Sequence, residues 1–109
     1  MAGFQQVKAM RSLQVGLTSD VATKITQIRV YSQAIDPASV AANTVAAQTF
    51  TVTGLATTDK VLVNPGVATI GVAGAYVSAA NTLSVIFVNP TAAAIDPASS
   101  TWTIIAFRS

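Results

Sequence analysis

Apolar and polar side chains alternate with a period of two wherever this chain shows a regular pattern. Residues 49–53 alternate hydroxyl-bearing and apolar side chains, which predicts a β-strand with one buried face. In residues 102–107 both alternating faces are apolar, so we expect this strand to be covered on both sides. Residues 24–32 predict a further strand, with Ile28 and Val30 facing inward. The remaining expected strands are residues 60–63, 75–78, 82–88 and, as a strand or an extended arm, 12–17.

Proline-containing turns separate these runs. Four dipeptides place Asn or Asp before proline, a pairing that disfavours helix and initiates turns: Asp36-Pro37, Asn64-Pro65, Asn89-Pro90 and Asp96-Pro97. Short strands spaced by such turns indicate a sandwich, a jelly roll or a small barrel, and of these we expect a small β-sandwich or a jelly-roll-like fold. Only the surroundings of Phe4, Val7 and Met10 could form a helical turn. We therefore predict an all-β protein, with an extended N-terminal arm over residues 1–22 and a single β domain over residues 23–109.

The charge content suggests a component of an assembly. The 109 residues suffice for one domain, but only 9% of them are charged, against about 25% in an ordinary soluble domain. The surface must then consist largely of Ala, Thr, Ser, Asn and Gln, which protects a monomer poorly against association. We therefore expect the chain to pack against copies of itself or against partners.

Positive charge is concentrated near the N-terminus. Residues 1–29 hold four of the six cations and one acid, Asp20. These charges either bind a negatively charged partner or only keep the N-terminal segment soluble. Nucleic-acid binding is not expected, because clustered basic residues and stacking aromatic residues are both missing. Nor do we expect a membrane partner or a signal peptide, since no apolar stretch is long enough for a spanning helix and the N-terminus lacks an apolar core.

The side chains that enzymes use for chemistry are scarce. Histidine, cysteine and glutamate are absent, which excludes Ser–His–Asp and Cys–His arrangements and the usual zinc sites. The four aspartates lie in turns or polar connections, where a structural role is the simpler interpretation: Asp20, Asp36, Asp59 and Asp96. No calcium or phosphate motif is present. We therefore expect no enzyme activity, no metal and no cofactor.

Sugar binding stays open, because aromatic platforms need few charges. The candidates are Tyr31, Tyr76 and Trp102, although Trp102 lies in an apolar strand and fits a core position better. Three short strings also occur twice: Ala-Ile-Asp-Pro-Ala-Ser at 34–39 and 94–99, Ala-Ala-Asn-Thr at 41–44 and 79–82, and Val-Asn-Pro at 63–65 and 88–90. Their offsets differ, which is not the pattern of a repeat protein, so we interpret them as one turn solution used twice.

More than half of the chain resembles small virion proteins of tailed bacteriophages. The resemblance rests on residues 48–55 (QTFTVTGL), 59–65 (DKVLVNP), 77–83 (VSAANTL), 87–92 (FVNPTA) and 102–108 (WTIIAFR). In size and style it is nearest to head cement or decoration proteins. That resemblance implies a β-rich, often trimeric protein on the outer surface of the capsid, which clamps neighbouring major capsid proteins. Tail- and head-fibre modules, which would bind a host receptor or a glycan, share the same style and remain the alternative.

From this resemblance and the basic N-terminal arm we expect two partners, the major capsid protein and further copies of the chain. The expected location is the virion. The residues expected to contact the shell are Phe4, Val7, Lys8, Met10 and Arg11.

Overall fold

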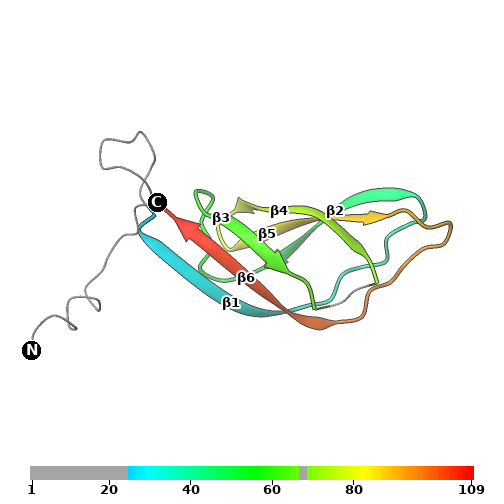
Figure 1. The fold of residues 1–109 in the computed structure, drawn as a ribbon, viewed down its shortest axis with the longest axis horizontal. Helices are drawn as coiled ribbons and strands as arrows, with labels where there is room; N and C mark the ends of the chain where they lie inside the picture. Colours follow the sequence, from blue (N-terminus) through cyan, green and yellow to red (C-terminus); the bar gives the residue numbers. More distant parts are fainter. Residues whose placement is uncertain (1–24, 67–68) are drawn as a thin grey trace, which may run out of the picture.

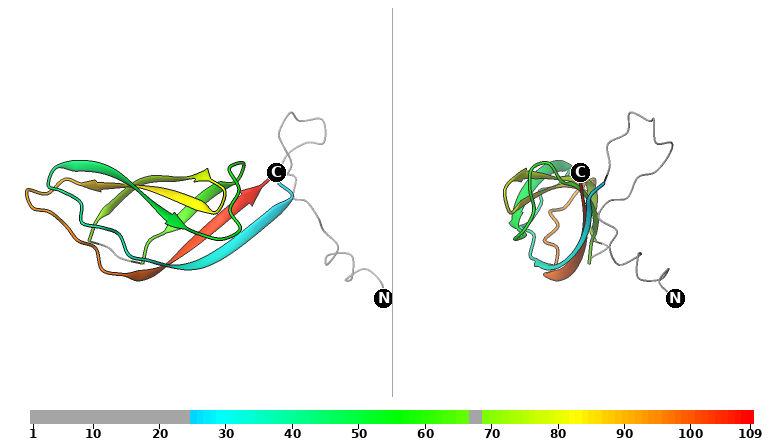
Figure 2. Two further views of the ribbon diagram at one scale, coloured as in Figure 1. Left: turned by 180° about the vertical axis from the view of Figure 1, so that it is seen from behind. Right: turned by 90° about the vertical axis from the view of Figure 1, so that its left-hand side faces the viewer.

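The protein folds as two antiparallel β-sheets packed face to face. The computed structural model describes residues 25–66 and 69–109, and within them we find six strands and no helix. The strands form two three-stranded sheets, ordered β1-β6-β3 and β2-β5-β4, which lie as separate layers (Figures 1 and 2). This confirms the all-β prediction and agrees with a small sandwich. The strands are β1 (Gln27–Ile35), β2 (Thr44–Thr51), β3 (Lys60–Asn64), β4 (Gly71–Ala79), β5 (Thr82–Asn89) and β6 (Ser100–Arg108).

The core lies between the two central strands, β5 and β6. Phe87 of β5 and Trp102 of β6 are fully buried, and their rings meet edge to face with centroids 5.9 Å apart. Phe50 of β2 adds a third ring, 6.3 Å from that of Phe87. Ile104 and Ala106 share the buried face of Trp102, as the alternation in residues 102–107 predicts. Since edge-to-face aromatic pairs add to the free energy of area burial, these rings join the two sheets.

The repeated string Ala-Ile-Asp-Pro-Ala-Ser marks two crossings between the sheets. Its copies lead from β1 to β2 and from β5 to β6 at one end of the sandwich, away from the C-terminus (Figure 1). The crossings are joined by two backbone hydrogen bonds between Val40 and Ile95, of 2.8 and 3.0 Å. The prolines of both copies, Pro37 and Pro97, are buried. The two copies thus serve one structural role, as expected from the sequence.

Strand β1 is turned over relative to the prediction. Ile28 and Val30, expected to face inward, are 50% and 67% exposed on the outer side of the sheet. Arg29 and Tyr31 occupy the inner positions instead. Arg29 is stabilised there because its guanidinium donates hydrogen bonds to the carbonyl oxygen of Gly54 and to the hydroxyl of Tyr31. The inward assignment of Ile28 and Val30 is therefore wrong.

Among residues 25–66 and 69–109, no layer of the same chain covers the outer side of β6, where a cover was expected: Val30 and Leu62, which flank Ile105, are 67% and 60% exposed. β2 begins five residues earlier than predicted, at Thr44. The domain boundary after residue 22, the possible strand 12–17 and the possible helical turn near the N-terminus all lie outside the described residues.

Candidate interaction surface

The outer side of the β1-β6-β3 sheet carries an exposed apolar surface. Strand pairing places five apolar side chains beside one another on this side, and we call them the outer apolar face: Ile28, Val30, Leu62, Ile105 and Phe107. Three of them are at least half exposed. Together they expose an apolar area on the order of 400 Å², which is the scale of the largest, often functional, patches on monomeric proteins.

The register of the strands arranges this side in rows. Ile28, Phe107 and Lys60 form the first row, and Val30, Ile105 and Leu62 form the second. In the third row polar side chains take over: Ser32, Thr103 and Asn64. The face therefore changes along the strands from apolar to polar. Lys60 is the one charged side chain in these three rows.

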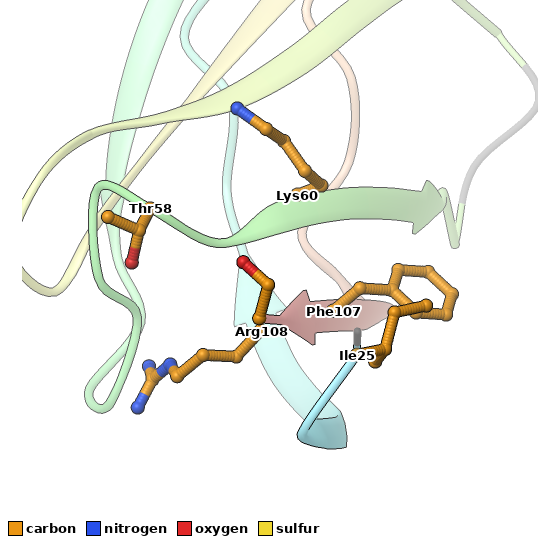
Figure 3. Close-up of a pocket in the computed structure, with 6 residues that line it drawn as sticks. Ile25, Thr58, Lys60, Phe107 and Arg108 are labelled. Carbon is orange, nitrogen blue, oxygen red and sulfur yellow. The ribbon is translucent and has the colours of Figure 1, made fainter. Parts of the chain in front are cut away.

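A hollow of about 540 Å³ lies at the apolar end of this face, where the chain leaves β6. Figure 3 shows the ring of Phe107 beside Ile25, with the guanidinium of Arg108 pointing away from both. Thr58, Lys60 and Ser109 complete the lining. Although four of its six lining residues are polar or charged, the surface of the hollow is mostly apolar and none of the lining residues is an acid, so the hollow extends the apolar face.

Beneath this face, Arg108 and Asp59 form an ion pair. The guanidinium donates two hydrogen bonds to the carboxylate of Asp59, of 2.7 and 2.8 Å, and a third of 3.0 Å to the carbonyl oxygen of Gly54. Asp59 is 3% exposed. The hydrogen bonds from Arg108 hold the pKa of Asp59 below its ordinary value, against the opposing effect of burial. The backbone N–H of Ala56, which donates to the same carboxylate, also lowers this pKa. The hydrogen bonds to Asp59 in turn raise the pKa of Arg108.

This ion pair fixes the connection between β2 and β3 to the other strands. The carbonyl oxygen of Gly54 accepts hydrogen bonds from Arg29 and Arg108, while its N–H donates to Oδ1 of Asn81 in the β4–β5 turn, at 2.8 Å. Gly54 has φ +107°, and a Cβ there would lie 2.9 Å from the hydroxyl of Tyr31. The polar groups of Asp59, Arg29 and Arg108 are thus occupied in holding the fold together.

At the opposite end, Asn89 joins the two crossings. Its side chain is fully buried, and its Nδ2 donates to the carbonyl oxygens of Val40, Ala41 and Ala93 at 2.9–3.1 Å. Its Oδ1 accepts from the N–H and the hydroxyl of Thr91, at 3.0 and 2.7 Å. This asparagine therefore replaces the backbone partners that two irregular segments would otherwise lack.

The aromatic residues considered for sugar binding are not brought together. Trp102 is buried in the core, which confirms the core interpretation. Tyr31 is half-buried on the inner side of β1, and Tyr76 is 54% exposed on the outer side of the other sheet. The expected shell contacts lie outside the described residues: Phe4, Val7, Lys8, Met10 and Arg11.

Charges in the described part of the chain balance. The described residues contain three cations and three acids, so the net charge of +2 comes from residues 1–24. Asp36 and Asp96 are exposed on the crossings, at the end of the sandwich opposite to Lys60. The described residues contain no group of three or more acids that could hold a metal ion. Residues 25–66 and 69–109 also include no helix that could span a lipid bilayer.

The outer apolar face was missed by sequence reasoning, because β1 was assigned the wrong face. A signal for it was nevertheless present, since Ile105 and Phe107 make the second face of their strand apolar. Comparison with known proteins adds no relative: no family model matches the chain, and no curated protein or solved structure is similar enough to count as a match.

Proposed function

We propose that this protein is a non-catalytic structural component of a phage virion, a cement or decoration protein on the outer surface of the head. The observation that carries the proposal is the outer apolar face on a small, charge-poor sandwich. A surface of this kind fits a protein that works by contact with other proteins. The resemblance described above supplies the virion context.

The polar groups support the same interpretation, because the clusters around Asp59 and Asn89 are engaged within the fold. A cement protein stabilises a shell by mass action: it binds the assembled lattice and not the free subunits, which shifts the equilibrium toward assembly. Many weak contacts per particle then add through multivalency. Its partners are the major capsid protein and further copies of the chain, in the trimer that the resemblance implies.

The first test is the copy number in purified virions, measured by quantitative mass spectrometry against the major capsid protein. A copy number of the same order as that of the capsid protein is expected for a protein that decorates the whole shell. A few tens of copies or fewer would instead assign the protein to a fibre or tail and direct attention to receptor or glycan binding. Absence from the particle would refute both roles.

A second test addresses residues 1–11, which include the proposed shell contacts Lys8 and Arg11. Deleting them is expected to abolish binding to particles that lack the protein, while the fluorescence-detected unfolding of the body stays unchanged. The double variant Lys8→Glu, Arg11→Glu is the matched control for charge: if binding uses an acidic surface, it fails as the deletion does. Full binding by the deletion variant would place the shell contact elsewhere.

A further inference from the structure

The outer apolar face is an unusual surface because the strand that builds its edge presents its apolar side chains outward. In β1 the outer positions are Ile28 and Val30, while the inner positions beside them hold Arg29 and Tyr31. A strand of a sandwich normally has the reverse arrangement. Arg29 donates hydrogen bonds to the carbonyl oxygen of Gly54 and to the hydroxyl of Tyr31, so these inner polar groups have partners, whereas the apolar side chains on the outer side stay in contact with water.

We propose that a second copy of this chain covers the outer apolar face, in a two-fold pair with Ile105 on the axis. The proposal deepens the self-association part of the proposed function and holds wherever the protein is located. It concerns a two-fold contact, which differs in symmetry from the three-fold contact that the resemblance implies. A self-complementary, charge-poor face is what a two-fold interface requires, since each patch must match itself.

The single charge in the three rows selects the orientation of the pair. With the axis across the strands, the first row of one copy lies over the third row of the other. Lys60 then faces Asn64 of the second copy, whose side-chain oxygen can accept a hydrogen bond from the ammonium group. With the axis along the strands, Lys60 would instead be pressed against Ile28 of the second copy, which buries a charge without a partner.

With the axis across the strands, which makes the strands of the two copies antiparallel, the second row of one copy also lies over the second row of the other. Val30, Ile105 and Leu62 would each meet the same residue of the second copy, so Val30 and Leu62, the two most exposed residues of the outer apolar face, leave water together. The three rows bury on the order of 600 Å² on each copy, near the lower limit for specific interfaces. We therefore expect a pair that dissociates in the micromolar range.

Single-cysteine cross-linking tests the geometry directly, since the chain has no cysteine of its own. Packed sheets lie about 10 Å apart, too far for a disulfide, so a short bis-maleimide is the reagent. Leu62→Cys is expected to form a covalent dimer at least fivefold more efficiently than Val45→Cys. Val45 is the matched control, because it is 66% exposed and lies on the outer side of the other sheet.

Equal cross-linking of these two variants would overturn the proposal. A Leu62→Cys protein that cross-links only when mixed with Val30→Cys would overturn the orientation, because these two positions meet when the axis runs along the strands.

Sedimentation equilibrium supplies an independent measurement on the full chain. At about 100 µM, above the expected micromolar dissociation range, the wild type should have an even multiple of the chain mass of 11.1 kDa: two chains for the two-fold pair alone, or six chains where the three-fold contact of the proposed function also forms. Leu62→Asp should halve that mass, whereas Val45→Asp should leave it unchanged, with folding of both variants checked by tryptophan fluorescence. A wild type that stays monomeric at this concentration, or a pair that survives Leu62→Asp, refutes the contact. Neither result bears on copy number in the virion, so the two proposals fail separately.

Discussion

Replacing Asn89 by alanine should lower the free energy of unfolding by about 3 kcal/mol, since this side chain joins the two crossings between the sheets. Asn89 is fully buried and has five hydrogen-bond contacts, three through Nδ2 and two through Oδ1. Alanine removes both the donor and the acceptor. The crossings would then be held by three backbone hydrogen bonds, two between Val40 and Ile95 and one from the N–H of Asn43 to the carbonyl oxygen of Thr91.

The magnitude follows from counting what is lost. Nδ2 has two hydrogens for its three acceptors. Oδ1 accepts from the N–H of Thr91 and from the hydroxyl of Thr91, whose single hydrogen is shared with the carbonyl oxygen of Ala93. This gives at most four effective hydrogen bonds of about 1 kcal/mol each. The loss is smaller than 4 kcal/mol for two reasons. The carbonyl oxygen of Val40 still accepts a hydrogen bond from the N–H of Ile95, and the exposed groups of Thr91 and Ala93 can bind water in place of Asn89. About 3 kcal/mol corresponds to a fall in Tm of roughly 12–24 °C for a domain of this size.

Guanidinium unfolding followed by tryptophan fluorescence is the suitable assay. The single tryptophan, Trp102, is fully buried and reports on the core. Asn64→Ala is the matched control, because it changes the asparagine of the same Val-Asn-Pro string at an exposed position, where about 0.5 kcal/mol or less is expected. The slope of the transition should be the same in both variants. Coincident midpoints for Asn89→Ala and Asn64→Ala would refute the reasoning.

Three further variants test other parts of the fold. Asp59→Asn should lower the free energy of unfolding by about 2 kcal/mol at pH 7, because it weakens hydrogen bonds to a charged group. The pKa of Asp59 is lowered in the folded state, so the stability that its carboxylate contributes is present above the unfolded pKa of about 3.9 and is lost as pH falls through the folded pKa. The urea midpoints of wild type and variant should therefore converge at low pH. Gly54→Ala should destabilise by about 1–3 kcal/mol in thermal unfolding, since φ is +107° and the added Cβ meets the hydroxyl of Tyr31; an unchanged Tm would contradict the strained backbone. Phe87→Ala should cost about 3–5 kcal/mol and leave little folded protein by circular dichroism at 37 °C, whereas a cooperative transition near that of the wild type would argue against a core built on this ring.

Much of the fold could be predicted because local and global preferences agree along the central strands. In residues 102–107 the alternation that places Trp102 inward also places Ile104 and Ala106 inward, and all three are buried. β2 was placed less well. The part that the prediction missed, residues 44–48, contains Ala46, Ala47 and Gln48, which have little strand preference, and Gln48 hydrogen-bonds the backbone of Ala38 in the preceding crossing. That contact depends on tertiary structure, so local pattern cannot predict it.

The outer apolar face could not be predicted for a related reason. The alternation in β1 is clear, but it defines two faces without saying which one is inward. The rule that apolar side chains face the core failed here, because a polar cluster of Arg29, Gly54 and Arg108 occupies the inner side at this end. The pairing of Arg108 with Asp59 joins residues 49 positions apart, and nothing in the sequence around either residue indicates it.

The two Val-Asn-Pro strings show where local sequence stops determining structure. Both end a strand before a proline, so the turn itself is set by the tripeptide. Their asparagines nevertheless differ, since Asn89 is fully buried and Asn64 is exposed. The difference arises from strand order. β5 is the centre of its sheet, so both crossings close over its end, whereas β3 is an edge strand whose end has one neighbour in the sheet. A short motif therefore predicts the turn, and the position of its strand in the sheet decides whether the same side chain stabilises the fold or contacts solvent.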